Sequence, residues 1–348
     1  MPLLKGLVSI LLPVYNGAER LAHALDSLFN QTYPNIEIIV CDDGSTDETL
    51  EILRSYQAQN SPLKFPLKIT EHPTNLGVVA AANTCLNAAQ GKFTARMDHD
   101  DVMLPKKIAK QMEFASRLDG DYLIATRIDI NDMMGLRPGQ WQYIHWQNAS
   151  LTPVEHEREI YTECPMCHPT FLLKRELLLK VGGYQQQSWS EDYDMLFRAH
   201  IHGVKMYKMP EKLLIKSLHP DQTTWRDPSS KRGELMKAKA HYFFQDQKWM
   251  DKRKLYIMGT GSTGKLVADV LLAVGMPPIA FLDDRIEEPN RTLRGIKCLP
   301  LDQDFKPKYW NDESLILFAI ADPAGKIRAR EVLEKNGFDF YKEVLPWV

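Results

Sequence analysis

Cysteine is scarce in this sequence, and its five cysteines follow no obvious pairing pattern. Their number is odd and they are scattered between positions 41 and 298, which argues against a disulfide framework and for a reducing compartment. Cys164 and Cys167 form a Cys-x-x-Cys pair, but no second cysteine or histidine pair follows at the interval of a zinc site. We interpret the pair as two ordinary thiols in a loop, with a structural metal as the alternative.

Long apolar runs and a strong net charge are also missing. No apolar stretch approaches the roughly 20 residues that a transmembrane helix needs. The apolar N-terminus carries no basic segment and no small-residue cleavage site, so residues 7–14 are interpreted as a strand rather than a signal peptide. The net charge of −2 gives no reason to expect nucleic acid as a partner. We therefore expect a globular protein of the cytoplasm.

What the first half of the chain does have is an alternation of β-rich and helical runs. Strand-like runs at 7–14, 36–43, 67–72 and 92–98 alternate with helical patterns at 17–31, 44–59, 77–91 and 105–118. This alternation is typical of an α/β domain with a mostly parallel sheet. Between about Asp129 and Cys167 the pattern fades, so we expect an irregular region there, which could recognise an acceptor.

A second α/β pattern begins near the C-terminal quarter. Residues 254–275 read as strand, glycine-rich turn and helix, and further strand-like runs follow. A charged, helix-prone stretch precedes them. We predict a first domain over 1–225, a helical linker over 226–252, and a small Rossmann-like domain over 253–348.

Two clusters of carboxylates stand at the ends of predicted strands. Asp42 and Asp43 follow one strand, and Asp98, Asp100 and Asp101 follow another. Ligands of open α/β sheets bind outside the carboxyl ends of the strands, and clustered carboxylates suit a divalent cation such as Mg²⁺ or Mn²⁺. The alternative is that each carboxylate caps a helix or faces water, which would fit Asp101 just ahead of a helical pattern.

Several motifs occur in an order that resembles the family-2 glycosyltransferases of the GT-A fold. They are VSILLPVYNGAERLAHALDSLFNQTYPNIEIIVCDDGSTDET, NLGVVAAAN, GKFTARMDHDDVMLP, HPTFLLKRELLLKVGGY, SEDYDMLFR and HPDQTT, within residues 7–224. The resemblance implies a metal-dependent, inverting enzyme that takes sugar from a nucleotide-diphosphate donor, with UDP-sugar the first expectation. It also implies a glycan or lipid-linked acceptor, surface-polysaccharide synthesis, and work in the cytoplasm or at the inner membrane face.

The resemblance also assigns roles to individual residues. For the nucleotide and donor sugar it implies Pro13, Tyr15, Asn16, Glu19, Asp42, Asp43, Asn75 and Asp98. Asp100 and His219 would hold the Mn²⁺ or Mg²⁺ ion. Asp192 would be the catalytic base, with Glu191 beside it as a supporting or acceptor-binding carboxylate.

This chain departs from the family pattern at two positions. Many members carry arginine where this chain has Ala82, and a small residue where it has His99 between the aspartates of the D-x-D motif. Asp192 precedes an apolar run, so its pKa is expected to be raised, as suits a base. The alternative for Asp192 is a helix cap.

A glycine-rich turn, GTGSTGK, lies near the C-terminus. Leu266 stands where a P-loop needs serine or threonine, which excludes that motif. Gly259, Gly261 and Gly264 instead give G-x-G-x-x-G between strand and helix, with Asp283 at the end of the next strand. The segment resembles the N-terminal nucleotide-sugar-binding domain of bacterial sugar acyltransferases. It would bind a second nucleotide, or serve to dock or form a homo-oligomer.

Two other classes of function remain open on the sequence. One is a nucleotide-binding oxidoreductase or sugar-modifying enzyme centred on the glycine-rich turn. The other is a non-catalytic nucleotide-sugar sensor or scaffold. The second is disfavoured by the complete set of Asp43, Asp98, Asp100 and Asp192, because loss of function usually removes the metal carboxylate or the base first.

Overall fold

The chain folds into two compact units. The computed structural model describes residues 6–59, 64–219, 228–286 and 291–348. Described residues within Met1–His156, Pro165–Gln187 and Glu191–Asp227 form the first unit, and those within Glu157–Cys164, Ser188–Ser190 and Pro228–Val348 form the second. The two short middle segments that join the second unit were predicted by no sequence pattern. The stretch 226–252, predicted as a linker, contributes its described residues to the second unit.

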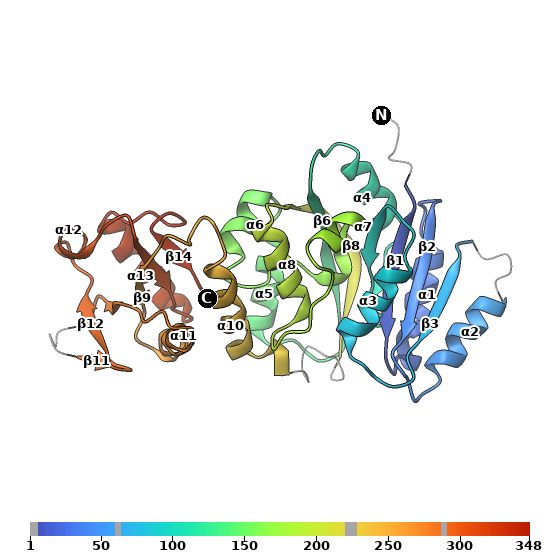
Figure 1. Cartoon of the computed structure of the whole chain (residues 1–348), viewed down its shortest axis with the longest axis horizontal. Coiled ribbons are helices and arrows are strands. Elements are labelled where there is room, and N and C mark those ends of the chain that lie inside the picture. The colour runs from blue at the N-terminus through green and yellow to red at the C-terminus, as the bar shows by residue number, and fades with distance from the viewer. Residues whose placement is uncertain (1–5, 60–63, 220–227, 287–290) are drawn as a thin grey trace. The chain divides into compact units, whose positions relative to one another are not determined.

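A large sheet organises the first unit (Figure 1). Its strands are β1 (Val8–Val14), β2 (Ile36–Asp42), β3 (Leu67–Glu71), β4 (Phe93–Arg96), β5 (Val102–Met103), β6 (Tyr122–Asp132), β7 (Leu172–Lys174) and β8 (Lys205–Leu218). They lie in the order β3-β2-β1-β4-β7-β6-β8-β5. β1 pairs in parallel with β2 and β4, and β6 with β8, whereas β7 and β5 run antiparallel to their neighbours. The predicted mostly parallel α/β sheet is confirmed.

Helices connect these strands. They are α1 (Ala18–Phe29), α2 (Thr49–Gln59), α3 (Val78–Ala88), α4 (Lys107–Ala115), α5 (Pro138–Ala149), α6 (Pro153–Glu159), α7 (Arg175–Lys180) and α8 (Glu191–Ile201), with the short turn η1 (His168–Thr170). The prediction that residues 129–167 are irregular is wrong, because α5 and α6 lie there. Of the twelve α5 residues only Gln147 is buried, so the helix has no apolar stripe that a periodicity could reveal.

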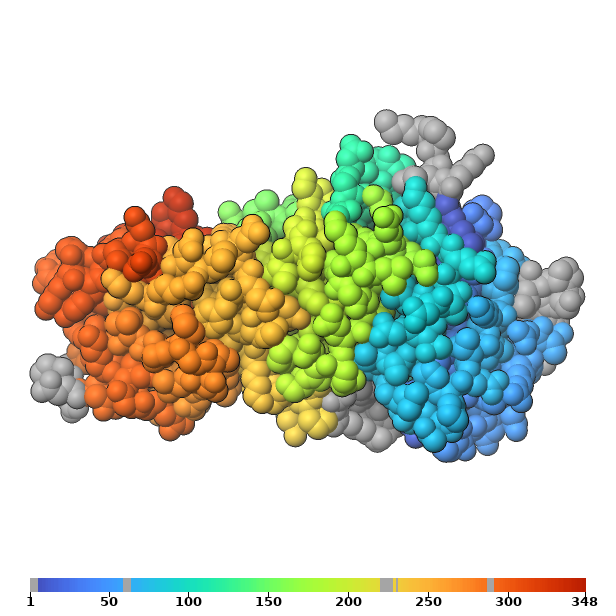
Figure 2. All heavy atoms as spheres, in the orientation of Figure 1, coloured from blue at the N-terminus to red at the C-terminus, as the bar shows by residue number. Residues whose placement is uncertain are grey.

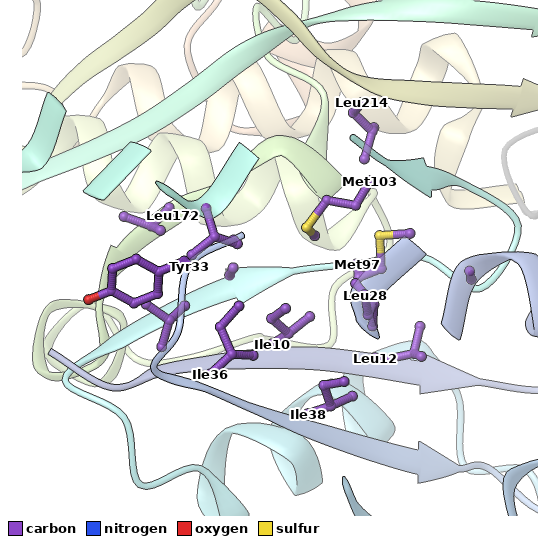
Figure 3. Close-up of a cluster of buried hydrophobic side chains, with 14 of the residues drawn as sticks. Ile10, Leu12, Leu28, Tyr33, Ile36, Ile38, Met97, Met103, Leu172 and Leu214 are labelled. Carbon is purple, nitrogen blue, oxygen red and sulfur yellow. The ribbon is translucent and has the colours of Figure 1, made fainter. Parts of the chain in front are cut away.

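The main core of the first unit lies between its central strands and α1 (Figure 3). Every residue of β1 and β2 is buried, as expected of strands covered on both faces. Ile10 and Leu12 of β1 belong to this cluster together with Ile38 of β2 and Leu28 of α1. Each such side chain stabilises the fold by about 1.5–3 kcal/mol through burial. This rigid centre fixes where β1, β2 and β4 end.

The second unit has a smaller sheet of its own. Its elements are η2 (Pro228–Ser230), α10 (Arg232–Phe243), β9 (Lys254–Met258), α11 (Ser262–Ala273), β10 (Ala280–Asp283), β11 (Thr292–Leu293), β12 (Ile296–Pro300), α12 (Phe305–Tyr309), β13 (Ser314–Phe318), α13 (Pro323–Lys335) and β14 (Val344–Pro346). The order is β11-β12-β10-β9-β13-β14, parallel except for the β11–β12 pair. The expected second, smaller α/β sheet is thus confirmed.

Helix length and composition bear on membrane insertion. Across the described ranges, no helix combines the length and the apolar character that a bilayer crossing requires.

Candidate active site

The loops that follow β1 and β2 bring together most of the residues predicted for the nucleotide. Asp42 accepts hydrogen bonds from the backbone and the hydroxyl of Ser45, and the Ser45 hydroxyl in turn accepts one from the Asn16 backbone N–H at 2.9 Å. Asn16 has a φ of +48°, which its short polar side chain tolerates, and its Oδ1 accepts from the Thr46 N–H at 2.8 Å. The two loops therefore hold each other in place, beside the 41 % exposed ring of Tyr15.

Asp43 holds the loop that leads into α3. Its carboxylate is buried and accepts from the backbone N–H groups of Leu76 and Gly77, at 3.0 and 2.8 Å, and from His72 Nδ1 at 2.6 Å. Asn75 Oδ1 accepts from the same Gly77 N–H at 2.9 Å, so Asn75 lies beside Asp43. His72 was not singled out from the sequence, because a single histidine at the end of β3 has no local signal.

Two predicted nucleotide residues are placed differently. Pro13 lies within β1 and pairs in register with Cys41 of β2. Glu19 lies in the first turn of α1 and forms an ion pair with Arg20 at 2.8 Å, with 74 % of its side chain exposed. The structure thus shows Pro13 buried within β1 and Glu19 on the surface, and their contact with a base remains a prediction.

The acidic cluster forms behind β4 as a true three-dimensional group. Ligand oxygens of Asp98, Asp100 and Asp101 all lie within 4.8 Å of one another. His219, at the end of β8, points its Nε2 to Asp100 Oδ2 at 3.0 Å. The structure therefore brings the predicted metal pair Asp100 and His219 together from positions 119 residues apart. The rest of the HPDQTT motif, 220–224, lies outside the described residues.

Asp101 is not the helix cap or the surface group considered from the sequence. Its carboxylate is fully buried, its Oδ1 accepts from the Ser217 N–H at 3.0 Å, and its Oδ2 lies 3.7 Å from Lys216 Nζ. Lys106 is the N-cap residue of α4, without a side-chain cap. Burial disfavours the charge of Lys216, but Asp101 and the other nearby acids raise the pKa of Lys216 well above its usual value. Lys216 is a cation that the sequence reasoning missed.

The residues present fit a divalent cation. Mg²⁺ and Mn²⁺ prefer carboxylate oxygens, with Mn²⁺ also accepting imidazole, and Asp100 and His219 supply both. Within the described part of the chain, the buried His219 Nδ1 and Asp101 Oδ2 have no hydrogen-bond partner. Asp98 and Asp101 are engaged by Arg96 and by Ser217, so we expect Asp100 and His219 to be the principal ligands.

Arg96, a third residue that the sequence reasoning missed, precedes the D-x-D motif. Its Nε donates to Asp98 Oδ1 at 2.9 Å, and its side chain is only 5 % exposed. Burial disfavours the guanidinium charge, but Asp98 raises the pKa of Arg96 and is itself held ionised. The predicted strand 92–98 contained both residues, and residues two apart on a strand face the same side, so their spacing was a signal in the sequence, although β4 itself ends at Arg96.

Glu191 and Asp192 open α8 on the acceptor side of the predicted site. Asp192 Oδ1 accepts from the Tyr193 N–H at 2.7 Å. Burial, followed by the charge of Asp192, raises the pKa of Glu191 to about 7. The raised pKa expected for Asp192 stays a prediction, and its neighbour Glu191 has one that the sequence analysis did not expect. Two adjacent carboxyl groups of this kind can hold a single proton near neutral pH.

The segment before α8 is fastened to α3. Asn83 donates to the Tyr184 carbonyl at 2.8 Å and accepts from the Tyr184 N–H at 3.0 Å. Figure 2 shows these two segments, coloured cyan and green, side by side on the surface of the first unit. Ala82, where many family members carry arginine, lies within α3 and is fully buried. The helix thus contributes a fixed wall here instead of a cation.

The glycine-rich turn of the second unit is tightly built. A Cβ on Gly264 would lie 1.9 Å from the Gly259 carbonyl oxygen, and Gly259 has a φ of +117°. Gly261 is the N-cap of α11 and has open space around it. Thr260 Oγ1 donates to Asp283 Oδ2 at 2.7 Å. The structure therefore gathers Gly259, Gly261, Gly264 and Asp283 at one place, and their nucleotide remains a prediction.

Similar sequences and structures agree with this architecture. The sequence model described as Glycosyl transferase family 2 matches residues 9–182, and the PglD N-terminal domain matches residues 254–333. The EpsE protein of Bacillus subtilis (strain 168), named as a glycosyltransferase, is 30 % identical over 210 residues, covering 59 % of this chain and 71 % of EpsE. The uncharacterized glycosyltransferase RP339 of Rickettsia prowazekii (strain Madrid E) is 33 % identical over 226 residues, covering 63 % of this chain and 66 % of RP339.

Two solved structures share the fold. S. aureus TarS 1-349 in complex with UDP-GlcNAc superposes with a TM-score of 0.56 at 20 % identity, covering 76 % of this chain and 71 % of TarS. The mannosyltransferase PcManGT from Pyrobaculum calidifontis, in complex with GDP-Man and Mn²⁺, has a TM-score of 0.54 at 17 % identity and covers 79 % of each chain. Together with the sequence matches, the strand-end carboxylates and the carboxylate pair of α8 lead to one conclusion: this chain belongs to glycosyl transferase family 2 and is a glycosyltransferase.

Proposed function

We propose that this glycosyltransferase takes its sugar from a nucleotide-diphosphate donor, with a UDP-sugar as the first expectation. One observation carries the proposal: His219 Nε2 lies 3.0 Å from Asp100 Oδ2. Both residues lie at the edge of the sheet formed by the carboxyl ends of the strands, where Asp98, Asp42 and Asp43 also lie. The similarity to TarS, whose structure contains UDP-GlcNAc, supports the choice of uridine, and that to PcManGT, with GDP-Man and Mn²⁺, supports a metal.

The proposed reaction uses two groups of acidic residues: Asp98 and Asp100 behind β4, and Glu191 and Asp192 at the start of α8. Asp192 takes the proton of an acceptor hydroxyl, which then attacks the anomeric carbon as the bond to the diphosphate breaks. A single displacement inverts this carbon, so an α-linked donor gives a β-linkage. Asp98 binds the donor sugar, and Arg96 keeps Asp98 ionised. Mn²⁺ or Mg²⁺ held by Asp100 and His219 would supply Lewis-acid stabilisation of the leaving diphosphate.

The acceptor is proposed to be a hydroxyl of a glycan or of a lipid-linked glycan in bacterial surface-polysaccharide synthesis. Such an acceptor would bring the enzyme from the cytoplasm to the inner membrane face. Support comes from α5, which lies within the stretch expected to recognise the acceptor and carries Trp141, a 39 % exposed aromatic side chain suited to sugar stacking.

We propose a second nucleotide site at the glycine-rich turn of the second unit, with docking or homo-oligomerisation as the alternative. The support is the close approach of Gly264 to Gly259 and the bond from Thr260 to Asp283. Equilibrium dialysis with labelled UDP distinguishes the two. Two UDP molecules per chain, falling to one in Asp283→Ala, are expected; one UDP in both proteins would favour docking.

The donor is tested by measuring UDP and GDP release from a panel of nucleotide sugars, with Mn²⁺, Mg²⁺ or EDTA. Wild type should release nucleotide slowly from one donor, and EDTA or Asp100→Ala should abolish the release. Asp129→Asn is the matched control, because Asp129 is an exposed partner of Lys212 on β8. No release and no nucleotide binding with any metal would refute the proposal.

A further inference from the structure

A row of buried polar side chains leads from the donor side of the site to Glu191. Arg96 donates to Asp98 at 2.9 Å, and its guanidinium lies 5.8 Å from the centre of the Tyr184 ring. The Tyr184 hydroxyl lies 3.2 Å from His168 Nε2, and His168 Nδ1 lies 3.7 Å from Glu191 Oε1. Arg96, Tyr184 and His168 are each about 5 % exposed. The proposed transfer reaction gives none of these three a direct chemical step.

The protonation states along this row are set by burial. Burial and the charge of Arg96 lower the pKa of His168 to about 3, so its ring is neutral near pH 7. Burial raises the pKa of Tyr184 to about 12, so its hydroxyl keeps its proton. A neutral imidazole has one N–H and one lone pair, and which nitrogen carries the proton depends on its partners.

The partners of the row give it one direction. Arginine can only donate, and its guanidinium lies 5.8 Å from the centre of the Tyr184 ring; at the other end of the row the ionised carboxylate of Glu191, 3.7 Å from His168 Nδ1, can only accept. The hydroxyl proton of Tyr184 is then directed to His168 Nε2, which acts as the acceptor. The remaining proton of the ring sits on Nδ1, the nitrogen that faces Glu191. At 3.7 Å this is an electrostatic approach rather than a full hydrogen bond.

We infer that Tyr184 and His168 are positioning residues for the carboxylate pair: they aim the His168 Nδ1–H at Glu191 and so favour the fully ionised form of the pair, in which Asp192 can act as the base. This inference rests on the proposed glycosyl transfer, because it assigns the pair to the acceptor. The charged and titratable groups that face Glu191 are Asp192 on its own helix, His168, Tyr184, and Arg96 with Asp98 from the β4 side. The row therefore links the donor carboxylate to the acceptor base.

A tautomer measurement tests the arrangement without any activity. Two-dimensional ¹⁵N–¹H spectra of histidine-labelled protein at pH 7 should show His168 with its proton on Nδ1, the signal being assigned by its loss in His168→Asn. Tyr184→Phe should shift the ring to the Nε2–H form or to a mixture. A wild-type ring protonated on Nε2, or doubly protonated, would overturn the inference whether or not the enzyme transfers sugar.

Acceptor kinetics across pH test the consequence. Asparagine places its N–H near the position of histidine Nδ1, whereas glutamine places one near Nε2 and leucine has none. His168→Asn should keep the acid limb of kcat/KM for the acceptor, whereas His168→Gln, His168→Leu and Tyr184→Phe should move it up by about one pH unit. The donor KM should stay within about 2-fold in all four variants, since the change concerns one hydrogen bond away from the nucleotide.

The outcomes separate the two proposals. If wild type transfers sugar and the variants lose activity equally at every pH, the residues are structural and the positioning role is refuted. If wild type transfers nothing to any acceptor, the proposed function fails, and the tautomer result alone decides the geometry. A melting temperature close to wild type in Tyr184→Phe shows that the fold is kept, because this variant removes one oxygen atom and retains the buried ring.

Discussion

The two units of the chain both end a buried strand with an aspartate, yet they treat this carboxylate differently. In the second unit Asp283 is satisfied by Thr260 and by Arg285, and these bonds lower its pKa although burial opposes this. In the first unit three carboxylates crowd together, and His219 Nδ1, Asp101 Oδ2 and Arg96 Nη1 are buried without hydrogen-bond partners among the described residues. Buried polar atoms without partners cost free energy unless a ligand engages them. The first site thus has buried polar atoms that a ligand can engage, whereas the carboxylate of Asp283 already has protein partners.

The largest difference between the two units is expected when the proposed base, Asp192, is replaced. Asp192→Asn removes proton acceptance, so kcat should fall by about 10²–10⁴ while nucleotide binding stays intact. The measurement is single-turnover transfer with donor binding followed in parallel. Asp283→Asn, the matched change at the strand end of the second unit, should leave kcat nearly unchanged. An equal loss of kcat in both variants would show that catalysis is not confined to the site of the first unit.

The pH dependence of stability should next distinguish the half-buried Glu191 of the first unit from an exposed glutamate of the second unit. The pKa of Glu191 is raised to about 7, so the folded state binds its proton more tightly than the unfolded state. The resulting stabilisation is complete below about pH 4.5 and is lost as the pH rises towards 7. Wild type should therefore lose stability between pH 5 and pH 8, and Glu191→Gln should not. The free energy of unfolding of Glu191→Gln, measured against wild type, should be higher at pH 8 than at pH 5 by at most about 3 kcal/mol.

Urea denaturation at the two pH values measures this effect. The exposed Glu331, on α13 of the second unit, provides the control as Glu331→Gln, which should change the difference between the two pH values very little. If the free energies of unfolding of wild type and Glu191→Gln differ by the same amount at both pH values, the raised pKa of Glu191 is contradicted.

The glycine-rich turn should respond to added side chains according to their surroundings. Gly264→Ala places a Cβ 1.9 Å from the Gly259 carbonyl oxygen, so the backbone must shift, at a cost of about 1–3 kcal/mol or more. Hydrogen exchange of the β9 and β13 amides should accelerate in Gly264→Ala. The same exchange should stay unchanged in Gly261→Ala, where the added methyl group meets open space.

The smallest expected effect on stability is that of Gly261→Asp, which also tests whether a second nucleotide binds at the glycine-rich turn. Gly261 is the N-cap of α11, with extended backbone and no side-chain cap. Gly261→Asp should stabilise the helix by a few tenths of a kcal/mol, and its charge should repel a phosphate at the same point. Loss of the second UDP with an unchanged or slightly raised melting temperature is the expected result. Retention of that UDP would place it elsewhere.

The sequence predicted elements well where burial leaves a pattern. The strands β1, β2 and β4 and the helices α1 and α3 lie inside the predicted runs, because apolar residues recur with the period of each element. It failed for α5, whose single buried residue leaves no period, and for the segments 157–164 and 188–190, whose grouping with the second unit depends on contacts distant in sequence. Asp101 was misjudged because its partner, Ser217, is 116 positions away.

The order of motifs by itself determined the fold class, the family and which carboxylates end which strands, since each is a local feature of spacing and residue type. Only the tertiary structure decided that Asp100 meets His219, that Lys216 lies among the acids, and that burial raises the pKa of Glu191. These depend on burial and on charges brought together from distant strands. The pKa of a group and the pairing of a polar atom depend on burial and on neighbouring charges, and these are set only when the chain folds.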